Sequence, residues 1–166
     1  MTQQFRIETK DSFRVIGYKI STTNRKKEGK KMIPLHWESF HKEHKSDKLF
    51  SIMNMQPQGL LGINVYNIDV TDAKKFDYYI AVASDYQPDN EMSTYQVPAC
   101  TWAIFPCTVE TIGKTEVMAI SKWLPKAKYK PLNSGYITGR MKSQAPDIEY
   151  YGQDGYAEVW IAIKRN

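Results

Sequence analysis

P-D-I-E-Y-Y-G-Q-D-G-Y-A-E-V-W-I-A-I-K, residues Pro146 to Lys164, holds two runs rich in aromatic and β-branched residues on either side of Asp154-Gly155. An Asp-Gly pair suits the positive φ angles of a type I′ turn, so the sequence predicts a β-hairpin with a two-residue loop. In that register Glu149 lies directly opposite Trp160.

Side chains alternate between the two faces of a strand, so this register also predicts which residues share a face. One predicted face holds carboxylates among aromatic rings: Asp147, Glu149, Tyr151, Glu158 and Trp160. The other is apolar apart from one hydroxyl: Ile148, Tyr150, Val159, Ile161 and Ile163. The second set is typical of a core, whereas a purely structural sheet rarely needs the first.

Along the whole chain, hydrophobic periodicity predicts two successive units with the order strand, helix, strand, strand, and the hairpin ends the second unit. The first unit comprises a strand over 5–20 with a possible turn at 10–12, a helix over 32–45, a helical extension or second helix over 49–55, and strands over 60–68 and 76–84. Pro34 suits the first turn of the helix.

The second unit comprises a strand run over 95–108 bent at Pro98 and Pro106, a helix over 115–124, a connection over 126–145, and the final hairpin. Pro125 is expected to end the helix, because a proline disfavours a helical residue before it. A polar loop over 85–92 is the best boundary between the halves, about 1–88 and 89–166.

Three aromatic pairs mark the repeat, at separations of 86, 84 and 81 residues: Trp37 and Trp123, Tyr66 and Tyr150, Tyr79 and Trp160. Two such units can cover each other and leave a cleft between them, where ligands commonly bind. We therefore expect one α+β domain over 1–166, formed by two pseudo-twofold units with antiparallel sheets, helices on one side and a ligand cleft between the units.

Composition is that of an ordinary globular protein, with 42% hydrophobic and 25% charged residues, but eleven tyrosines and four tryptophans favour a ligand pocket or an interface. The formal charge of +5 comes partly from the run at 25–31. That run lacks interleaved aromatics and any nucleic-acid-binding motif, so we expect a solvated loop and no direct nucleic-acid partner.

Metal, nucleotide and membrane functions have no support in the sequence. His36 and His41 are five residues apart, whereas two helical zinc ligands need a spacing of four, and no third ligand accompanies His44. Cys100 and Cys107 lie in an apolar run without metal-ligand spacing. We expect no metal, no cofactor, no catalytic motif and no membrane segment, and a reduced, cytoplasmic protein.

Glu149 is the residue with the clearest chemical potential. A buried carboxylate is costly unless it is paired, and a bound cation together with aromatic faces can offset that cost. A carboxyl group with a raised pKa can instead act as a general acid or base. The third alternative is structural: Glu149 bonds a tyrosine hydroxyl or faces water.

Several segments in order resemble the GyrI-like domains, the effector-binding domains of multidrug-responsive transcription regulators. The likeness covers about Phe5 to Lys164 and is carried by F-R-V-I-G-Y (13–18), I-P-L-H-W-E-S-F (33–40), F-D-Y-Y-I-A-V (76–82), A-C-T-W-A-I-F-P (99–106) and W-L-P…S-G-Y…P-D-I-E-Y-Y…E-V-W-I-A-I-K (123–164).

The resemblance implies two strand-helix-strand-strand units and an aromatic ligand cleft with a glutamate near its floor, which Glu149 matches. Trp160 and Tyr151 are expected to bind the ligand with Glu149. The other residues expected in the cleft wall are Tyr18, Trp37, Tyr66, Tyr79 and Trp102. The chain differs from the regulators in three respects: it has no helix-turn-helix pattern, its last strand reads I-A-I where family members read I-P-I or V-P-V, and its hairpin loop is short.

Three functions follow as hypotheses. The first is a stand-alone module, monomeric or homodimeric, that binds a lipophilic, cationic or aromatic small molecule through Glu149. The second is a hydrolase that uses the same glutamate on reactive electrophiles. The third is a protein-interaction module such as a gyrase modulator.

Overall fold

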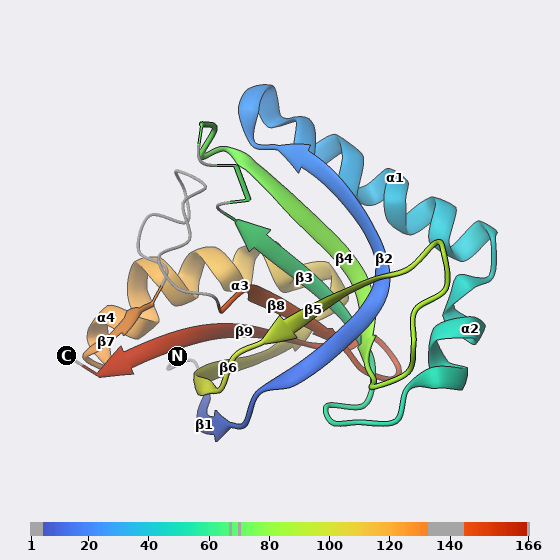
Figure 1. The fold of residues 1–166 in the computed structure, drawn as a ribbon. Helices are drawn as coiled ribbons and strands as arrows, with labels where there is room; N and C mark the ends of the chain where they lie inside the picture. Colours follow the sequence, from blue (N-terminus) through green and yellow to red (C-terminus); the bar gives the residue numbers. More distant parts are fainter. Residues whose placement is uncertain (1–4, 67, 70, 133–144, 166) are drawn as a thin grey trace.

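The chain folds into two strand-helix-strand-strand units that share one antiparallel sheet (Figure 1). The computed structural model describes residues 5–66, 68–69, 71–132 and 145–165. The first part contains β1 (Arg6–Lys10), β2 (Phe13–Thr23), a 3₁₀ turn η1 (Arg25–Lys27), α1 (Glu28–Lys42), α2 (Lys45–Ile52), β3 (Leu60–Tyr66) and β4 (Lys75–Ala83).

The second part repeats that order, with β7 as an additional short strand. It contains β5 (Ser93–Val97), β6 (Cys100–Thr108), a 3₁₀ turn η2 (Val109–Thr111), α3 (Ile112–Met118), a π-helical turn η3 (Ala119–Trp123), α4 (Leu124–Lys126), β7 (Tyr129–Pro131), β8 (Asp147–Tyr151) and β9 (Tyr156–Arg165). The S-G-Y segment at 134–136 and most of the predicted connection over 126–145 lie outside the described residues.

The strand order shows the internal symmetry. Over the described residues it is β1-β6-β9-β8-β3-β4-β2-β5, and the short strand β7 pairs with β9 outside this order. Exchanging each strand for its counterpart (β1 with β5, β2 with β6, β3 with β8, β4 with β9) reproduces the same order from the other end. The predicted α+β fold with two pseudo-twofold units is confirmed, and the β3–β8 ladder at the centre joins them into one sheet.

Both helices begin earlier than predicted. α1 starts at Glu28, so Pro34 lies in the helix interior and not in the first turn, which corrects that expectation. Contact with the sheet supports the extra turn: a Cβ on Gly29 would come within 2.9 Å of the Phe76 ring. Close packing of this turn on β4 therefore extends the helix beyond the residues that periodicity alone indicates.

Pro125 does not end the second helix, contrary to expectation. A proline ring in a regular helix collides with the carbonyl four residues before it, which here belongs to Ser121. The chain widens to a π-turn over Ala119–Trp123, where the Leu124 N–H bonds to the Ala119 carbonyl, and the helix continues to Lys126. The wider turn accommodates the proline.

The final hairpin forms, but its predicted register is wrong by one residue. Asp154 and Gly155 have the expected positive φ angles of 56° and 79°. The Gly152 N–H, however, bonds to the Tyr156 carbonyl at 2.8 Å, so Gly152 and Gln153 together oppose Tyr156 as a bulge. A shift of one residue moves a strand's side chains to the opposite face relative to its partner.

Glu149 consequently pairs with Val159, while Trp160 pairs with Ile148 on the other face. The predicted equivalence of Tyr66 and Tyr150 is wrong for a related reason. Tyr66 is four residues after Gly62 on β3, and Gly62 pairs with Glu149, so Tyr66 shares the face of Glu149. Tyr150 lies on the opposite face.

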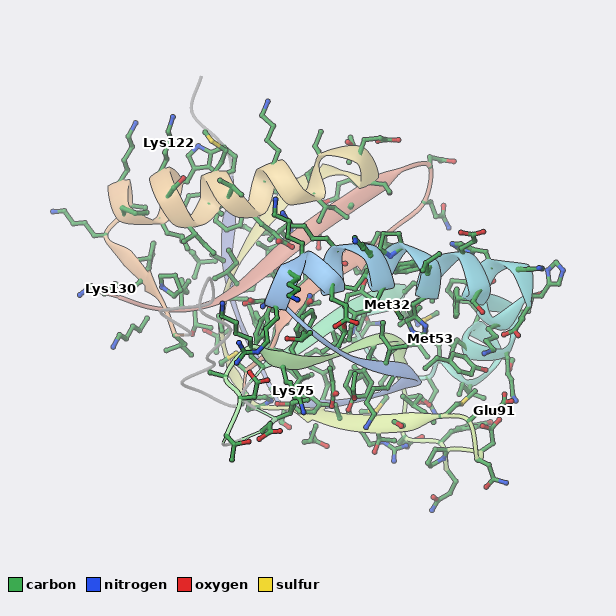
Figure 2. All side chains as sticks on the ribbon, turned by 90° about the horizontal axis from the view of Figure 1, so that it is seen from above. Met32, Met53, Lys75, Glu91, Lys122 and Lys130 are labelled. Carbon is green, nitrogen blue, oxygen red and sulfur yellow. The ribbon has the colours of Figure 1, made fainter. Side chains whose placement is uncertain are left out.

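One face of the sheet carries the helices and the other is packed with aromatic rings. α1 and the α3–α4 run lie on the same side (Figures 1 and 2). The sheet curls strongly, and Gly17 on β2 permits a close strand approach, since a Cβ there would lie 2.0 Å from the Ile80 carbonyl oxygen. On the face away from the helices Trp102 and Trp160 are 0% and 2% exposed.

Candidate functional site

Glu149 lies at the centre of the helix-bearing face. Residues on six adjacent strands form a row across that face, defined by their pairing: Tyr18, Ile80, Gly62, Glu149, Val159 and Phe105. One end of the row lies under α1, where Tyr18 contacts Phe40. The other end lies under the α3–α4 run, where Phe105 stacks on Trp123. Glu149 therefore lies between the two helices.

A chain of hydrogen bonds holds the Glu149 carboxylate. The Tyr78 hydroxyl donates to Glu149 Oε1 at 2.8 Å, and the Tyr151 hydroxyl donates to the same oxygen at 2.7 Å. The Trp37 indole N–H donates in turn to the Tyr78 hydroxyl at 2.9 Å. The Asn64 side chain also bonds to Glu149. The network joins β3, β4, β8 and α1.

Burial sets the electrostatics of this network. It raises the pKa of Glu149, although the hydrogen bonds from Tyr151, Tyr78 and Asn64 act in the opposite direction. Burial, with the nearby Glu149 charge, raises the pKa of Tyr78 and of Tyr151. Both phenols therefore remain protonated and act as donors at neutral pH.

Gly62 provides the space that the network occupies. It is the cross-strand partner of Glu149. A Cβ at Gly62 would lie 2.4 Å from the Tyr78 hydroxyl oxygen and 2.5 Å from Glu149 Oε1. Any other residue at this position would displace one or both groups.

Two aromatic rings lie over the network. Trp37 on α1 and Tyr151 on β8 meet edge to face, with ring centroids 4.9 Å apart. Both side chains are half-buried. Tyr78 and Tyr151 bond to the carboxylate, and the Trp37 ring packs against Tyr151. Aromatic rings close to a carboxylate favour a bound organic cation.

Two more carboxyl groups lie on the α3 side of Glu149. Asp147 is two residues before Glu149 on the same face of β8, and Glu116 comes from α3. Burial, followed by the Glu149 charge, raises the pKa of Asp147 to about 7. Burial also raises the pKa of Glu116, and the charges of Glu149 and Asp147 add to the effect. Both acids line a narrow opening with Ile120, Ile148, Val159 and Ile161.

The other predicted cleft residues lie elsewhere. Trp160, Trp102 and Tyr79 are on the face opposite Glu149, where Trp102 and Trp160 pack with ring centroids 5.8 Å apart. Trp160 donates its indole N–H to Glu158 at 2.9 Å, so Glu158 also belongs to that face. The one-residue bulge accounts for Trp160 and Glu158, and the wrong choice of strand parity accounts for Trp102 and Tyr79.

Tyr66 and Tyr18 are on the correct face but away from the carboxylate. Tyr66 packs against Phe76 with centroids 5.3 Å apart. Tyr18 lies beneath α1, where Lys45 Nζ is 4.5 Å from its ring centroid. Of the eight predicted residues, the structure brings together Glu149, Tyr151 and Trp37.

Sequence reasoning missed Tyr78, Gly62, Asn64 and Glu116. Tyr78 and Tyr79 are adjacent, so a correct strand parity would have selected Tyr78. A glycine inside an apolar strand run indicates close approach of another group, and that signal was present at Gly62.

In the part of the chain that the structure describes, no group of three or more histidine, cysteine or acidic side chains could hold a metal ion, and no helix is long and apolar enough to cross a membrane. A wider opening of about 400 Å³, at Lys10–Phe13 against Met55–Pro57, contains no part of the Glu149 network.

Comparison with known proteins agrees with this architecture. Residues 6–163 match the family described as integron-associated effector binding protein. No curated protein matches the chain.

Among solved structures, SAV2435 bound to tetraphenylphosphonium is similar at 16% identity and a TM-score of 0.75, over 97% of this chain and 94% of that one. An integron cassette protein from the mobile metagenome of Vibrio cholerae is 20% identical, with a TM-score of 0.61 and 98% of each chain covered. The C-terminal domain of EcmrR is 11% identical, with a TM-score of 0.58 and 100% of each chain covered. At these identities the structures show a common fold.

Proposed function

This chain belongs to the integron-associated effector binding proteins, a GyrI-like family, and we propose that it binds a lipophilic organic cation with Glu149 as counter-charge. One observation carries the proposal: the Glu149 carboxylate lies between the two helices and is held by the Tyr78 and Tyr151 hydroxyls, with the Trp37 ring packed against Tyr151. The family relates the chain to the ligand-binding domains of transcription regulators.

The energetics favour a cation over a neutral ligand. Burial opposes ionisation of Glu149, so a positive charge beside the carboxylate recovers free energy that its hydrogen bonds only partly supply. Each aromatic face adds roughly 0.5–2 kcal/mol of cation–π attraction. Glu149 and the neighbouring Trp37 and Tyr151 side chains are all half-buried, so this part of the sheet face is partly accessible to a ligand.

The ligand of one structural neighbour supports the same class. SAV2435 was solved with tetraphenylphosphonium, a lipophilic aromatic cation. Tetraphenylphosphonium is therefore a suitable first probe for this chain.

The test is calorimetric titration of tetraphenylphosphonium into the wild type and into Glu149→Gln. We expect the variant to bind at least about tenfold more weakly, because a buried charge partner is lost while the side-chain shape is kept. Glu38→Gln, on the exposed side of α1, removes the same charge away from the site and serves as the matched control. Circular dichroism checks the fold, and equal affinity of Glu149→Gln and wild type would contradict the proposal.

A second candidate is hydrolysis of a reactive electrophile, and the raised pKa values favour it. An Asp147 carboxyl with a pKa of about 7 is partly protonated at neutral pH and lies beside Glu149, a candidate base. The assay is turnover of a strained electrophile such as an epoxide. Turnover that disappears in Glu149→Ala supports this candidate, whereas binding without turnover supports the first.

A further inference from the structure

Asp147 and Glu116 form a feature that the Glu149 network does not use. Asp147 and Glu149 are two positions apart on one strand face, so their Cα atoms lie about 7 Å apart. Glu116 approaches from α3 on the side away from Trp37. Within the described residues the Glu149 carboxylate has hydrogen-bond donors, whereas no hydrogen bond or ion pair reaches the side-chain carboxyl of Asp147 or of Glu116.

The surroundings of these two acids are apolar. The opening that they line is walled by Ile120, Ile148, Val159 and Ile161. Acids among isoleucines lose hydration, and the shifts toward higher pKa at Asp147 and Glu116 reflect that loss. Two carboxyl groups without donors, both directed into one apolar opening, are a receptor for a hydrogen-bond donor that carries positive charge.

The size of the opening indicates which cation fits. Its volume is about 10 Å³, close to the space of a single water molecule. A quaternary ammonium or a guanidinium group is too large for that space without rearrangement. A primary ammonium group is similar in size to water and offers three donors to the two carboxyl groups.

We propose that Asp147 and Glu116 form a second subsite of the cleft, which takes a primary ammonium group. The preferred ligand is then a dication, with a bulky lipophilic cation at Glu149 and an ammonium group on a short linker at Asp147 and Glu116. This inference rests on the proposed function, because the first cation anchors the second.

Two phosphonium compounds of nearly equal shape test the subsite. Butyltriphenylphosphonium carries one charge, and (3-aminopropyl)triphenylphosphonium replaces its terminal methyl group with an ammonium group. Calorimetry at pH 8 keeps the amine protonated and lies above the Asp147 pKa of about 7. We expect the wild type to bind the aminopropyl compound about tenfold more tightly than the butyl compound.

The variants separate this subsite from the Glu149 site. Asp147→Asn and Glu116→Gln are each expected to reduce the tenfold preference to about twofold or less, with butyl affinity almost unchanged. Glu149→Gln should weaken both compounds and keep the preference. Glu110→Gln, an exposed acid just before α3, is the charge-matched control and should change neither value.

Two results overturn the subsite while leaving the proposed function standing: equal wild-type affinities for the two compounds, or a preference that survives both Asp147→Asn and Glu116→Gln. Failure of the wild type to bind either compound overturns the proposed function, and the subsite with it. Glu116 lies on a half-exposed helix face, so its variant remains informative if the strand variant is unstable.

Discussion

Gly62→Ala adds one methyl group at the most crowded point of the site. The new Cβ would lie 2.4 Å from the Tyr78 hydroxyl oxygen and 2.5 Å from Glu149 Oε1, about 1 Å inside ordinary contact. The two oxygens are 2.8 Å apart and hydrogen-bonded, so the methyl group has to push them away together or separate them. Separation breaks a hydrogen bond to a charged group.

Hydrogen bonds of that kind contribute roughly 1.5–3 kcal/mol. Replacing glycine with alanine returns about 0.4–1 kcal/mol by restricting the unfolded chain. We therefore expect Gly62→Ala to lower the free energy of unfolding by about 1–2 kcal/mol in urea titrations, and to weaken tetraphenylphosphonium binding because the carboxylate is displaced.

Gly113→Ala is the matched control. Gly113 lies in α3, and a Cβ there has no atom within 4 Å. Alanine should stabilise that helix by up to about 1 kcal/mol. Tyr78→Phe supplies a second comparison, because removing the hydroxyl removes the shorter of the two clashes and should reduce the cost of Gly62→Ala by at least 0.5 kcal/mol. If Gly62→Ala matches the wild type in both stability and ligand affinity, the close packing around Glu149 is refuted.

Two further predictions concern the same network. Trp37→Phe keeps an aromatic ring but loses the indole N–H that donates to Tyr78, so unfolding in urea should show a loss of about 1 kcal/mol; no loss would mean that solvent replaces this donor. Asp147 has a folded pKa of about 7 against an ordinary value of 3.8, so the native state binds more protons across this interval and the free energy of unfolding falls as pH rises through it. Asp147→Asn should show a smaller fall between pH 4 and 7 by urea titration, and parallel curves for the two proteins would contradict the shift.

The order of elements and the duplication could be predicted from sequence because both depend on local pattern. Strand alternation, helical periodicity and the Asp154-Gly155 turn each need only neighbouring residues. Glu149 and Tyr151 share a strand, so their common face follows from alternation alone. Trp37 is expected from the family resemblance, as one of the aromatic residues of the implied cleft wall.

Which residues of other strands lie on the same face as Glu149 depends on how the strands pair. In the β8–β9 hairpin that pairing is shifted by a bulge. Gly152 and Gln153 together oppose Tyr156, and this single extra residue places Trp160 and Glu158 on the sheet face opposite Glu149. A glycine next to a turn is a weak signal, because glycine also occurs in ordinary loops. Whether Tyr78 or Tyr79 faces the helices depends on a different long-range pairing, that of β4 with β2 and β3.

The duplicated fold forms this site by departing from its own symmetry. Gly62 and Glu149 are the middle pair of the β3–β8 ladder, where the two units meet. If both positions carried glutamate, the two carboxylates would lie directly opposite each other and repel. Glycine on β3 leaves space for one carboxylate and for the donors that hold it. The first unit supplies Gly62, Asn64, Tyr78 and Trp37, while the second supplies the acids and Tyr151. Neither unit alone contains both the charge and enough donors to stabilise it, so the site exists only where the two units join.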